Sequence, residues 1–351
     1  MTSSALTSKL KASSVATETR LAIPEIQKHY AHLNMGSVLY KQPSQQPSLE
    51  RIPRPFGRLP EFHICDGDPA MTAINRAAQL TCQTGKFIRV PLICSADEKR
   101  PGGDWRMNVD GSEMPYRVKE RLCRRSTLWA TLGTPATPSL ESACQTNYPI
   151  PIDGGILSEE VVVFRGPDYK KLPPSEWGVL PVVSVPPVRW PKLTETGTRY
   201  SLDNERNIVK DKLRASLLIC IAKGYSVIVV GDFGLGKRYR NPPQEMAKLW
   251  CNVFLWDVMV RGRIQAVTFV FEDPQQCTTH LIRDALSNKG RGDGSRGMSS
   301  SSLPSTFSSS SLTSSPTDLE IFRRMFSKGG IKKQMEERDY RYELQTLVHL
   351  S

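Results

Sequence analysis

Two glycine-containing segments that follow apolar stretches are the first candidates for chemistry in this sequence. Residues 100–104 follow an apolar run at 87–95, and residues 231–241 follow another at 226–231. Glycine has no Cβ, so the backbone can approach a ligand closely and direct its N–H groups at phosphate oxygens. The second segment also carries lysine and arginine, which suit a diphosphate. The predicted ligand-binding residues are Gly102, Gly103, Gly231, Gly234, Leu235, Gly236, Lys237, Tyr239 and Asn241.

Both segments have other readings. A Pro-Gly-Gly sequence is often only a tight turn. The spacing from Gly231 to Gly236 and Lys237 also matches a P-loop, and the acidic pair at 272–273 could accompany it. A P-loop, however, needs Ser or Thr after the lysine to hold Mg²⁺, and this chain has Arg238 there. Too few residues follow for the remaining strands of such a core, so a P-loop-like NTPase is the less favoured alternative.

Glu120 is the candidate catalytic residue. It lies in the basic stretch 118–128, which is expected to be helical and which follows the first glycine segment. A lone glutamate in a basic helix usually makes a surface salt bridge, but beside a bound sugar its carboxyl can donate a proton to a leaving oxygen. The neighbouring Lys119, Arg121 and Arg124 favour the ionised form instead. No defensible Ser/His/Asp or Cys/His arrangement accompanies it.

Apolar runs alternate with amphipathic stretches along most of the chain. The expected strands are 62–65, 87–95, 161–165, 179–185, 226–231 and 265–272, and the expected helices are 9–33, 70–78, 116–132, 204–222 and 243–258. This alternation is typical of the α/β class, with a mixed, largely parallel sheet between helices. Pro24 is expected to kink or split the first helix.

Composition divides the chain into four regions. Residues 1–60 form an expected N-terminal helical extension and Pro-rich loop, and residues 61–286 form the core. Residues 287–317 are rich in serine and cannot bury enough apolar surface to offset the entropy of ordering, so they are expected to be a disordered insertion. Residues 318–351 are expected to form a C-terminal helix and a charged tail.

Charge and cysteine usage narrow the partners and the compartment. The formal net charge of +12 fits a phosphate-bearing partner; nucleic acid stays open, although no known DNA-binding motif accompanies the charge. Eight singly spaced cysteines and five scattered histidines predict no metal site, and no cofactor is expected. Reduced cysteines and the lack of a secretory signal favour the cytoplasm or nucleus, with a mitochondrial transit peptide as a weaker option. No apolar run is long enough to span a membrane.

Taken together, the three segments resemble the microbial-type poly(ADP-ribose) glycohydrolases. That family has Asn-Phe-Ala-x-Ala-x-x-Pro-Gly-Gly-Gly, then Gln-Glu-Glu-x-Leu-Cys-Arg-x-Ser-x-Leu, then Gly-Ala-x-Gly-Cys-Gly-x-Phe-x-Asn-x-Pro. The matching residues here are 94–104, 118–128 and 231–243, and weaker similarity extends over about 10–285 and 318–327. The resemblance implies a three-layer α/β/α macrodomain-like sandwich. It also implies ADP-ribose, or poly(ADP-ribose) on modified proteins, as the ligand, and hydrolysis of the ribose–ribose glycosidic bond.

The chain departs from the family pattern mainly in the catalytic segment. Val118 and Lys119 stand in place of the Gln-Glu pair, and only Glu120 remains of the triplet. Asp104 replaces the third glycine, Cys94 replaces the asparagine, and the third motif is one residue longer. The resemblance makes the second glutamate the catalytic acid and the first the group that orients a ribose hydroxyl, so Glu120 would keep the acid's role. Impaired hydrolysis, an ADP-ribose-binding pseudoenzyme and a basic nucleic-acid-binding scaffold are the competing hypotheses.

Overall fold

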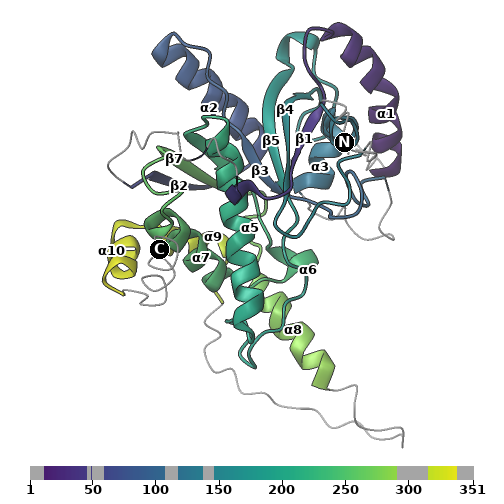
Figure 1. Cartoon of the computed structure of the whole chain (residues 1–351). Coiled ribbons are helices and arrows are strands. Elements are labelled where there is room, and N and C mark those ends of the chain that lie inside the picture. Colours follow the sequence, from purple (N-terminus) through teal and green to yellow (C-terminus); the bar gives the residue numbers. More distant parts are fainter. Residues whose placement is uncertain are drawn as a thin grey trace, which may run out of the picture.

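A single seven-stranded sheet organises the part of the chain that the computed structural model describes, residues 12–45, 49, 59–106, 118–136, 146–290 and 315–337 (Figure 1). The strand order is β1-β4-β5-β3-β6-β7-β2. The strands are β1 (Ser37–Tyr40), β2 (Glu61–Asp66), β3 (Leu92–Ser95), β4 (Gly155–Val163), β5 (Gly178–Val185), β6 (Val227–Val230) and β7 (Ala266–Phe271). Only β4 runs against the others, because it pairs antiparallel with both β1 and β5. The predicted mixed, largely parallel sheet is confirmed.

Helices cover both faces of the sheet. They are α1 (Ala12–His29), α2 (Pro69–Thr84), α3 (Val118–Arg125), α4 (Leu128–Gly133), α5 (Asp203–Ala222), α6 (Gly236–Tyr239), α7 (Pro243–Trp256), α8 (Thr278–Gly290), α9 (Asp318–Met325) and α10 (Lys328–Glu336). On one face, α5, α7 and α9 pack on β-strand residues such as Ile228 and Phe269. On the other, α2, α3 and α4 pack on residues such as Leu92 and Val229. The three-layer α/β/α sandwich is therefore confirmed.

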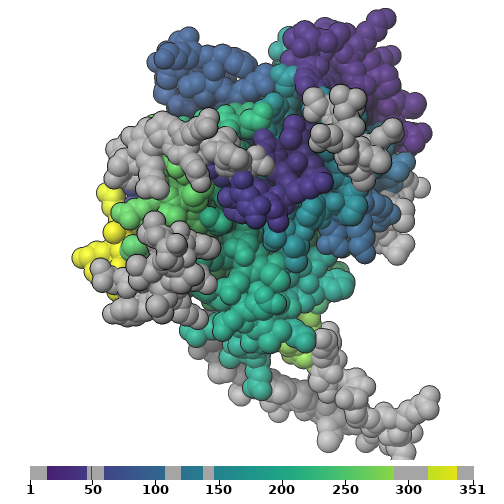
Figure 2. Space-filling model, viewed as in Figure 1, coloured from purple at the N-terminus to yellow at the C-terminus, as the bar shows by residue number. Residues whose placement is uncertain are grey.

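Strands β6 and β7 show why the sheet is buried between helices. Every residue of both strands is buried, which is expected for parallel strands covered on two faces. The space-filling view shows α1 in purple and α2 in blue as two separate projections at one end, and the teal residues of the α5 layer below them (Figure 2).

The N-terminal region is more closely integrated than the sequence suggested. Helix α1 continues through Pro24 without splitting, and it packs Ile26 on Val162 and Phe164. Strand β1, which was not predicted, pairs with β4 at the edge of the sheet. The described part of residues 1–60, which were predicted to be an extension of the core, therefore supplies a strand of the sheet.

Two expected elements are shorter than their patterns. The strand predicted at 87–95 is confined to β3, and the helix predicted at 116–132 is divided into α3 and α4. The division lies at Ser126, whose hydroxyl donates to the Leu122 carbonyl at 2.6 Å and accepts the Leu128 N–H at 3.2 Å. The Thr127 N–H donates to the carbonyl of Val162 at 3.0 Å, so the chain joins the sheet at this point instead of continuing as a helix.

The ends of the predicted serine-rich insertion are described, whereas residues 291–314 lie outside the described residues. Helix α8 extends to Gly290, into the range expected to be disordered. At the other end, the Ser315 hydroxyl accepts a hydrogen bond from Arg283 Nη1 at 2.9 Å. Thr317 then caps α9 in a capping box with Glu320. Both ends of the insertion are thus attached to the folded core.

Candidate ligand-binding site

The two predicted glycine segments lie together at the carboxyl edge of the parallel strands. One follows β3 and the other follows β6, and these strands are neighbours in the sheet. The Gly234 N–H donates to Ser95 Oγ at 3.1 Å, and the Tyr239 hydroxyl contacts the Ala96 carbonyl oxygen at 3.4 Å. This edge is where open α/β sheets bind ligands. The structure therefore brings the two segments into one site, which we call the carboxyl-edge site.

Glu120 enters the same site from the first turn of α3. Only 4% of the residue is exposed, and its Oε1 accepts a hydrogen bond from Arg238 Nη1 at 3.1 Å. Arg238 also donates from Nη2 to Asp97 Oδ2 at 3.0 Å, and its Nη1 lies 3.7 Å from Asp104 Oδ2. Three carboxylates from two segments thus surround one guanidinium group.

Asp97 fixes the first glycine segment around this guanidinium. Its Oδ1 accepts the N–H groups of Lys99 and Arg100, both at 3.0 Å. Its Oδ2 accepts a second arginine, Arg189, at 2.7 Å. Sequence reasoning did not identify Asp97 or Arg189, because an aspartate in a polar loop has no distinctive pattern until the arginines that bind it are known.

Gly103 is required where Asp97 and Arg238 meet. Its φ is +60°, and a Cβ would lie 3.3 Å from the Asp97 Cβ and 3.5 Å from Arg238 Nη2. Gly102 has a different neighbour. Its φ is +72°, and a Cβ would lie 2.5 Å from Cδ1 of the buried Trp105. The Pro-Gly-Gly segment is thus a tight turn that closes against the protein's own side chains.

The electrostatics of the site keep Arg238 charged. Burial acts to lower the pKa of Arg238, but Tyr239 and the three carboxylates act to raise it, and the net pKa lies above the ordinary value. The Tyr239 ring lies beside this charge, with the Arg238 guanidinium 5.9 Å from its centroid. Burial raises the pKa of Tyr239 to about 12, so its hydroxyl stays neutral.

One cation that faces Glu120, Arg238, comes from the second glycine segment and not from the helix. Arg121 Nη1 pairs with Glu272 at 3.0 Å, and its Nη2 donates to the Pro167 carbonyl. The side chains of Val118 and Lys119 lie outside the described ones. Arg238 belongs to the motif that is one residue longer than the family pattern. The extra length of this motif was the one sign in the sequence that the segment differs from the family pattern near Glu120.

Most of the predicted ligand-binding residues in the second segment are engaged within the protein. The Gly236 N–H donates to Thr278 Oγ1 at 2.7 Å, and the Gly231 N–H donates to the Ile93 carbonyl. Leu235 is buried in the core, whereas Lys237 is exposed. Asn241, 1% exposed, donates from Nδ2 to the carbonyls of Gly234 and Val188 at 2.8 and 2.9 Å.

These contacts show how the second segment keeps its shape. Gly234 and Gly236 have φ values of +73° and +75°, which favour glycine. Asn241 closes the segment by binding the carbonyl of Gly234, and the Tyr200 hydroxyl in turn donates to Asn241 Oδ1 at 3.0 Å. The backbone is therefore held from both sides before any ligand binds.

The P-loop alternative does not fit this geometry. A P-loop lysine opens a long helix, but α6 here has only four residues and ends at Arg240 in the left-handed conformation. Glu272, which could have resembled the second P-loop motif, is buried against Arg121. Burial raises the pKa of Glu272, and Arg121 opposes that effect.

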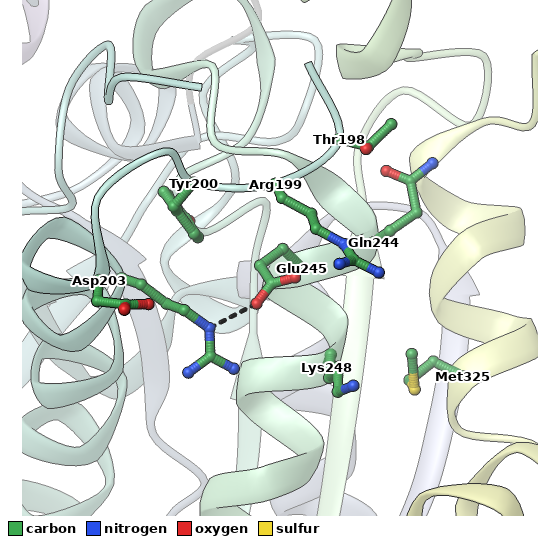
Figure 3. A pocket seen from close by; sticks show the side chains of 9 residues that line it. Thr198, Arg199, Tyr200, Asp203, Gln244, Glu245, Lys248 and Met325 are labelled. Carbon is green, nitrogen blue, oxygen red and sulfur yellow. Dashed lines mark hydrogen bonds and ion pairs between the residues drawn. The ribbon is translucent and has the colours of Figure 1, made fainter. Parts of the chain in front are cut away.

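A separate cavity of about 540 Å³ opens on another part of the molecule. Residues from the turn before α5, from α5 and α7, and from the end of α9 line it, including Arg199, Lys248 and Met325 (Figure 3). Arg206 Nε pairs with Glu245 Oε1 at 2.6 Å within this lining. Tyr200 connects the cavity to the carboxyl-edge site, because it lines the cavity and binds Asn241.

Two further observations concern the described residues alone. They contain no group of three or more His, Cys, Asp or Glu side chains arranged to hold a metal ion. Within the same ranges, no helix combines the length and the apolar character needed to cross a membrane.

Comparison with known proteins identifies the fold. No protein-family model and no curated protein matches the sequence. The structure, however, is similar to poly(ADP-ribose) glycohydrolase from Thermomonospora curvata, with a TM-score of 0.54, 19% identity, and coverage of 79% of this chain and 98% of that chain. The same enzyme bound to the inhibitor ADP-HPD gives a TM-score of 0.53 at 20% identity, with the same coverage of both chains. A variant of the Deinococcus radiodurans poly(ADP-ribose) glycohydrolase in complex with ADP-ribose gives 0.50 at 20% identity, covering 74% of this chain and 97% of that one. The fold implied by the sequence motifs is therefore confirmed: this chain has the fold of these poly(ADP-ribose) glycohydrolases.

Proposed function

We propose that this chain binds ADP-ribose, free or as a unit of poly(ADP-ribose), at the carboxyl-edge site and hydrolyses the glycosidic bond slowly or not at all. The fold and the position of the glycine segments support the ligand. Solved structures with this fold include complexes with ADP-ribose and with the inhibitor ADP-HPD. The two glycine segments that carry the sequence resemblance meet in this chain beside Glu120.

The observation that carries the catalytic part of the proposal is the ion pair between Glu120 and Arg238. Hydrolysis of the ribose–ribose bond needs an acid that gives a proton to the leaving oxygen while water attacks the sugar carbon. A guanidinium 3.1 Å from Oε1 holds this oxygen in an ion pair, so the carboxyl group is turned toward Arg238 and not toward a leaving oxygen. Each 1.4 kcal/mol of lost transition-state stabilisation slows turnover about tenfold.

A second feature acts in the same direction. The family pattern has a glutamate directly before the catalytic one, and this chain has Lys119 there. The resemblance assigns that first glutamate to a ribose hydroxyl, so its loss removes a contact that aligns the sugar with the acid. Misalignment by about 1 Å can cost 100-fold in rate.

Binding of an anionic ligand has separate support. Lys237 is exposed on the second segment, and Arg189 reaches the same site with 43% of its side chain exposed. The positive φ angles of Gly234 and Gly236 bring the backbone of that segment close to the sheet edge. A diphosphate bound there would compete with Asp97 for the two arginines that Asp97 now binds.

The test combines two measurements on one sample of the full chain. Calorimetry with ADP-ribose is expected to show binding, and a release assay with poly(ADP-ribose) is expected to show a rate at least about 100-fold below that of an active glycohydrolase assayed beside it. Glu120→Gln should abolish any residual release and keep binding. Glu98→Gln is the matched control, because Glu98 is an exposed acid of the first segment.

Each alternative has its own outcome. If the wild type releases ADP-ribose rapidly and Glu120→Gln releases it at the same rate, then Glu120 is not the acid and the proposal of slow or absent hydrolysis is wrong. Absence of ADP-ribose binding, together with binding of DNA or RNA that weakens steeply with salt, would favour the nucleic-acid scaffold instead.

A further inference from the structure

Helices α8 and α9 begin side by side, although 40 residues separate their first residues. Thr278 begins α8 and Asp318 begins α9. The Thr278 N–H donates to Asp318 Oδ1 at 2.9 Å, and the Thr278 hydroxyl donates to Asp318 Oδ2 at 2.5 Å. Gln276 Nε2 donates to the same Oδ2 at 2.9 Å. Thr278 and Asp318 are both fully buried, so these bonds lie away from solvent.

The Thr278 hydroxyl connects this pair to the carboxyl-edge site. Its proton points to Asp318, and its oxygen accepts the Gly236 N–H at 2.7 Å. The Gln276 side chain lies over the same glycine, since a Cβ on Gly236 would lie 2.8 Å from Gln276 Oε1. Asp318 therefore binds Thr278, which accepts the Gly236 N–H, and Gln276, which lies over Gly236. We call this set the Asp318 relay.

We propose that Asp318 is a positioning residue for the ligand, acting through Thr278 and Gln276 on the backbone of residues 234–236. This inference rests on the proposed function, because the ligand it positions is the ADP-ribose of the carboxyl-edge site. Gly236 has a φ of +75°, and the relay fixes the direction of its N–H. The relay thereby sets which backbone groups of the segment remain available to a diphosphate.

The chemistry of Asp318 explains why a carboxylate is needed there. An ionised carboxylate only accepts hydrogen bonds, and Asp318 accepts three. Such charge-assisted bonds are stronger than bonds between neutral groups. An asparagine would present an NH₂ group to the donors of Thr278 and Gln276. The Thr278 oxygen could accept from that NH₂ group, but the Thr278 hydroxyl proton would then lose its acceptor.

The test uses substitutions that change the relay without removing bulk. Thr278→Val keeps the shape and removes the hydroxyl, Thr278→Ser keeps the hydroxyl, and Asp318→Asn keeps the size and removes the charge. Glu320→Gln is the matched control, because Glu320 lies in the same first turn of α9 and serves the capping box alone. Three quantities are measured on the full chain: the ADP-ribose Kd, the Tm, and hydrogen exchange of the amides in 234–240.

A positioning role predicts a specific pattern. Thr278→Val and Asp318→Asn should weaken ADP-ribose binding at least about tenfold and speed exchange in 234–240, while Thr278→Ser stays within about twofold. Glu320→Gln should leave the Kd unchanged and the Tm within a few degrees, because glutamine can also accept the Thr317 N–H in a capping box. If the affinity of all four variants simply follows their Tm, Asp318 has only a structural role and the inference is overturned.

A different measurement tests the proposed function, namely ADP-ribose binding by the wild type. A wild type that fails to bind ADP-ribose refutes the proposed function. The exchange measurement then still decides the relay, because it needs no ligand. Unchanged exchange at 234–240 in Thr278→Val and Asp318→Asn would refute the relay, even if ADP-ribose binds well.

Discussion

Arg238 Nη1 lies 3.1 Å from Glu120 Oε1, although the two residues are 118 positions apart in the chain. Arg238 belongs to the segment proposed to hold a diphosphate, and Glu120 is the proposed catalytic acid. The pair therefore links the two parts of the proposed site. A substitution of Arg238 should therefore change the activity that depends on Glu120.

Arg238→Gln should raise the rate of ADP-ribose release from poly(ADP-ribose) about tenfold or more, because it frees Glu120 Oε1 from the ion pair. Breaking a buried ion pair should also cost about 3 kcal/mol of stability, measurable by urea unfolding. Arg240→Asn is the control, because Arg240 lies in the same turn but stacks over Trp190, and asparagine tolerates its left-handed backbone. A lower rate in Arg238→Gln than in the wild type would contradict the inhibitory role of Arg238.

Replacing Val118 with Gln and Lys119 with Glu in one variant should also raise release, because it restores the triplet that the resemblance associates with catalysis. The gain should vanish when Glu120→Gln is added, since Glu120 would still supply the proton. Single-turnover release from poly(ADP-ribose) measures both variants. An equal gain with and without Glu120 would mean that another group is the acid.

Gly236→Ala should weaken ADP-ribose binding severalfold or more, because a Cβ there would lie 2.8 Å from Gln276 Oε1 at a φ of +75°. Gly224→Ala is a matched control: its φ is +76°, but no atom lies within 4 Å of the added Cβ. Both changes should cost about 1 kcal/mol of stability through backbone strain. Calorimetry should show weaker binding only for Gly236→Ala, and equal affinity for both would place the ligand elsewhere.

Tyr239 should contribute to unfolding at high pH. Burial raises the pKa of Tyr239 to about 12, above its ordinary value of 10, so the folded state keeps the phenol proton more tightly than the unfolded state does. The resulting stability is fully present below pH 10 and is lost as the pH rises toward 12. Tyr239→Phe should therefore lose less stability than the wild type between these values, by up to about 3 kcal/mol. The measurement is the free energy of unfolding of both proteins at pH 9 and pH 11.5. An equal loss of stability in the wild type and in Tyr239→Phe would contradict the prediction.

Deleting residues 299–313 should leave the Tm within a few degrees of the wild type, because serine-rich sequence has little apolar surface to bury. The remaining residues, 291–298 and 314, are long enough to join α8 to Ser315. A chain that stops at residue 290 is the contrast. It lacks α9, whose Phe322 and Phe326 lie in the core, and it should fail to fold. A large loss of Tm in the internal deletion would show that the tract takes part in the fold.

Much of the architecture could be predicted from apolar periodicity. The runs at 226–231 and 265–272 became β6 and β7, since buried parallel strands leave continuous apolar sequence. Strand β1 could not be predicted in this way, because a four-residue segment is too short to show a pattern and becomes a strand by pairing with β4. The break at Ser126 likewise depends on tertiary bonds to Val162 that no local pattern contains.

The sequence could predict which segments form the site, but not which contacts their residues make there. Glycines and the lone glutamate indicated which segments meet, and the structure brings them together. The contacts of these residues could not be predicted. Asn241 and Gly236 bind other groups of the protein, and Arg238 binds acidic side chains. Apart from Gly234, which Asn241 binds within its own segment, these partners lie far away in sequence, and a motif does not record the long-range partner of each residue.

The adjacent starts of α8 and α9 have a consequence for the covalent chain between them. Asp318 and the apolar residues of α9 make their contacts through the folded core, so a single cut within 291–314 would leave those contacts unbroken. The C-terminal piece would then behave as a small bound subunit. In the intact chain, the connecting residues would act as a tether that keeps the effective concentration of α9 at its docking site in roughly the millimolar range.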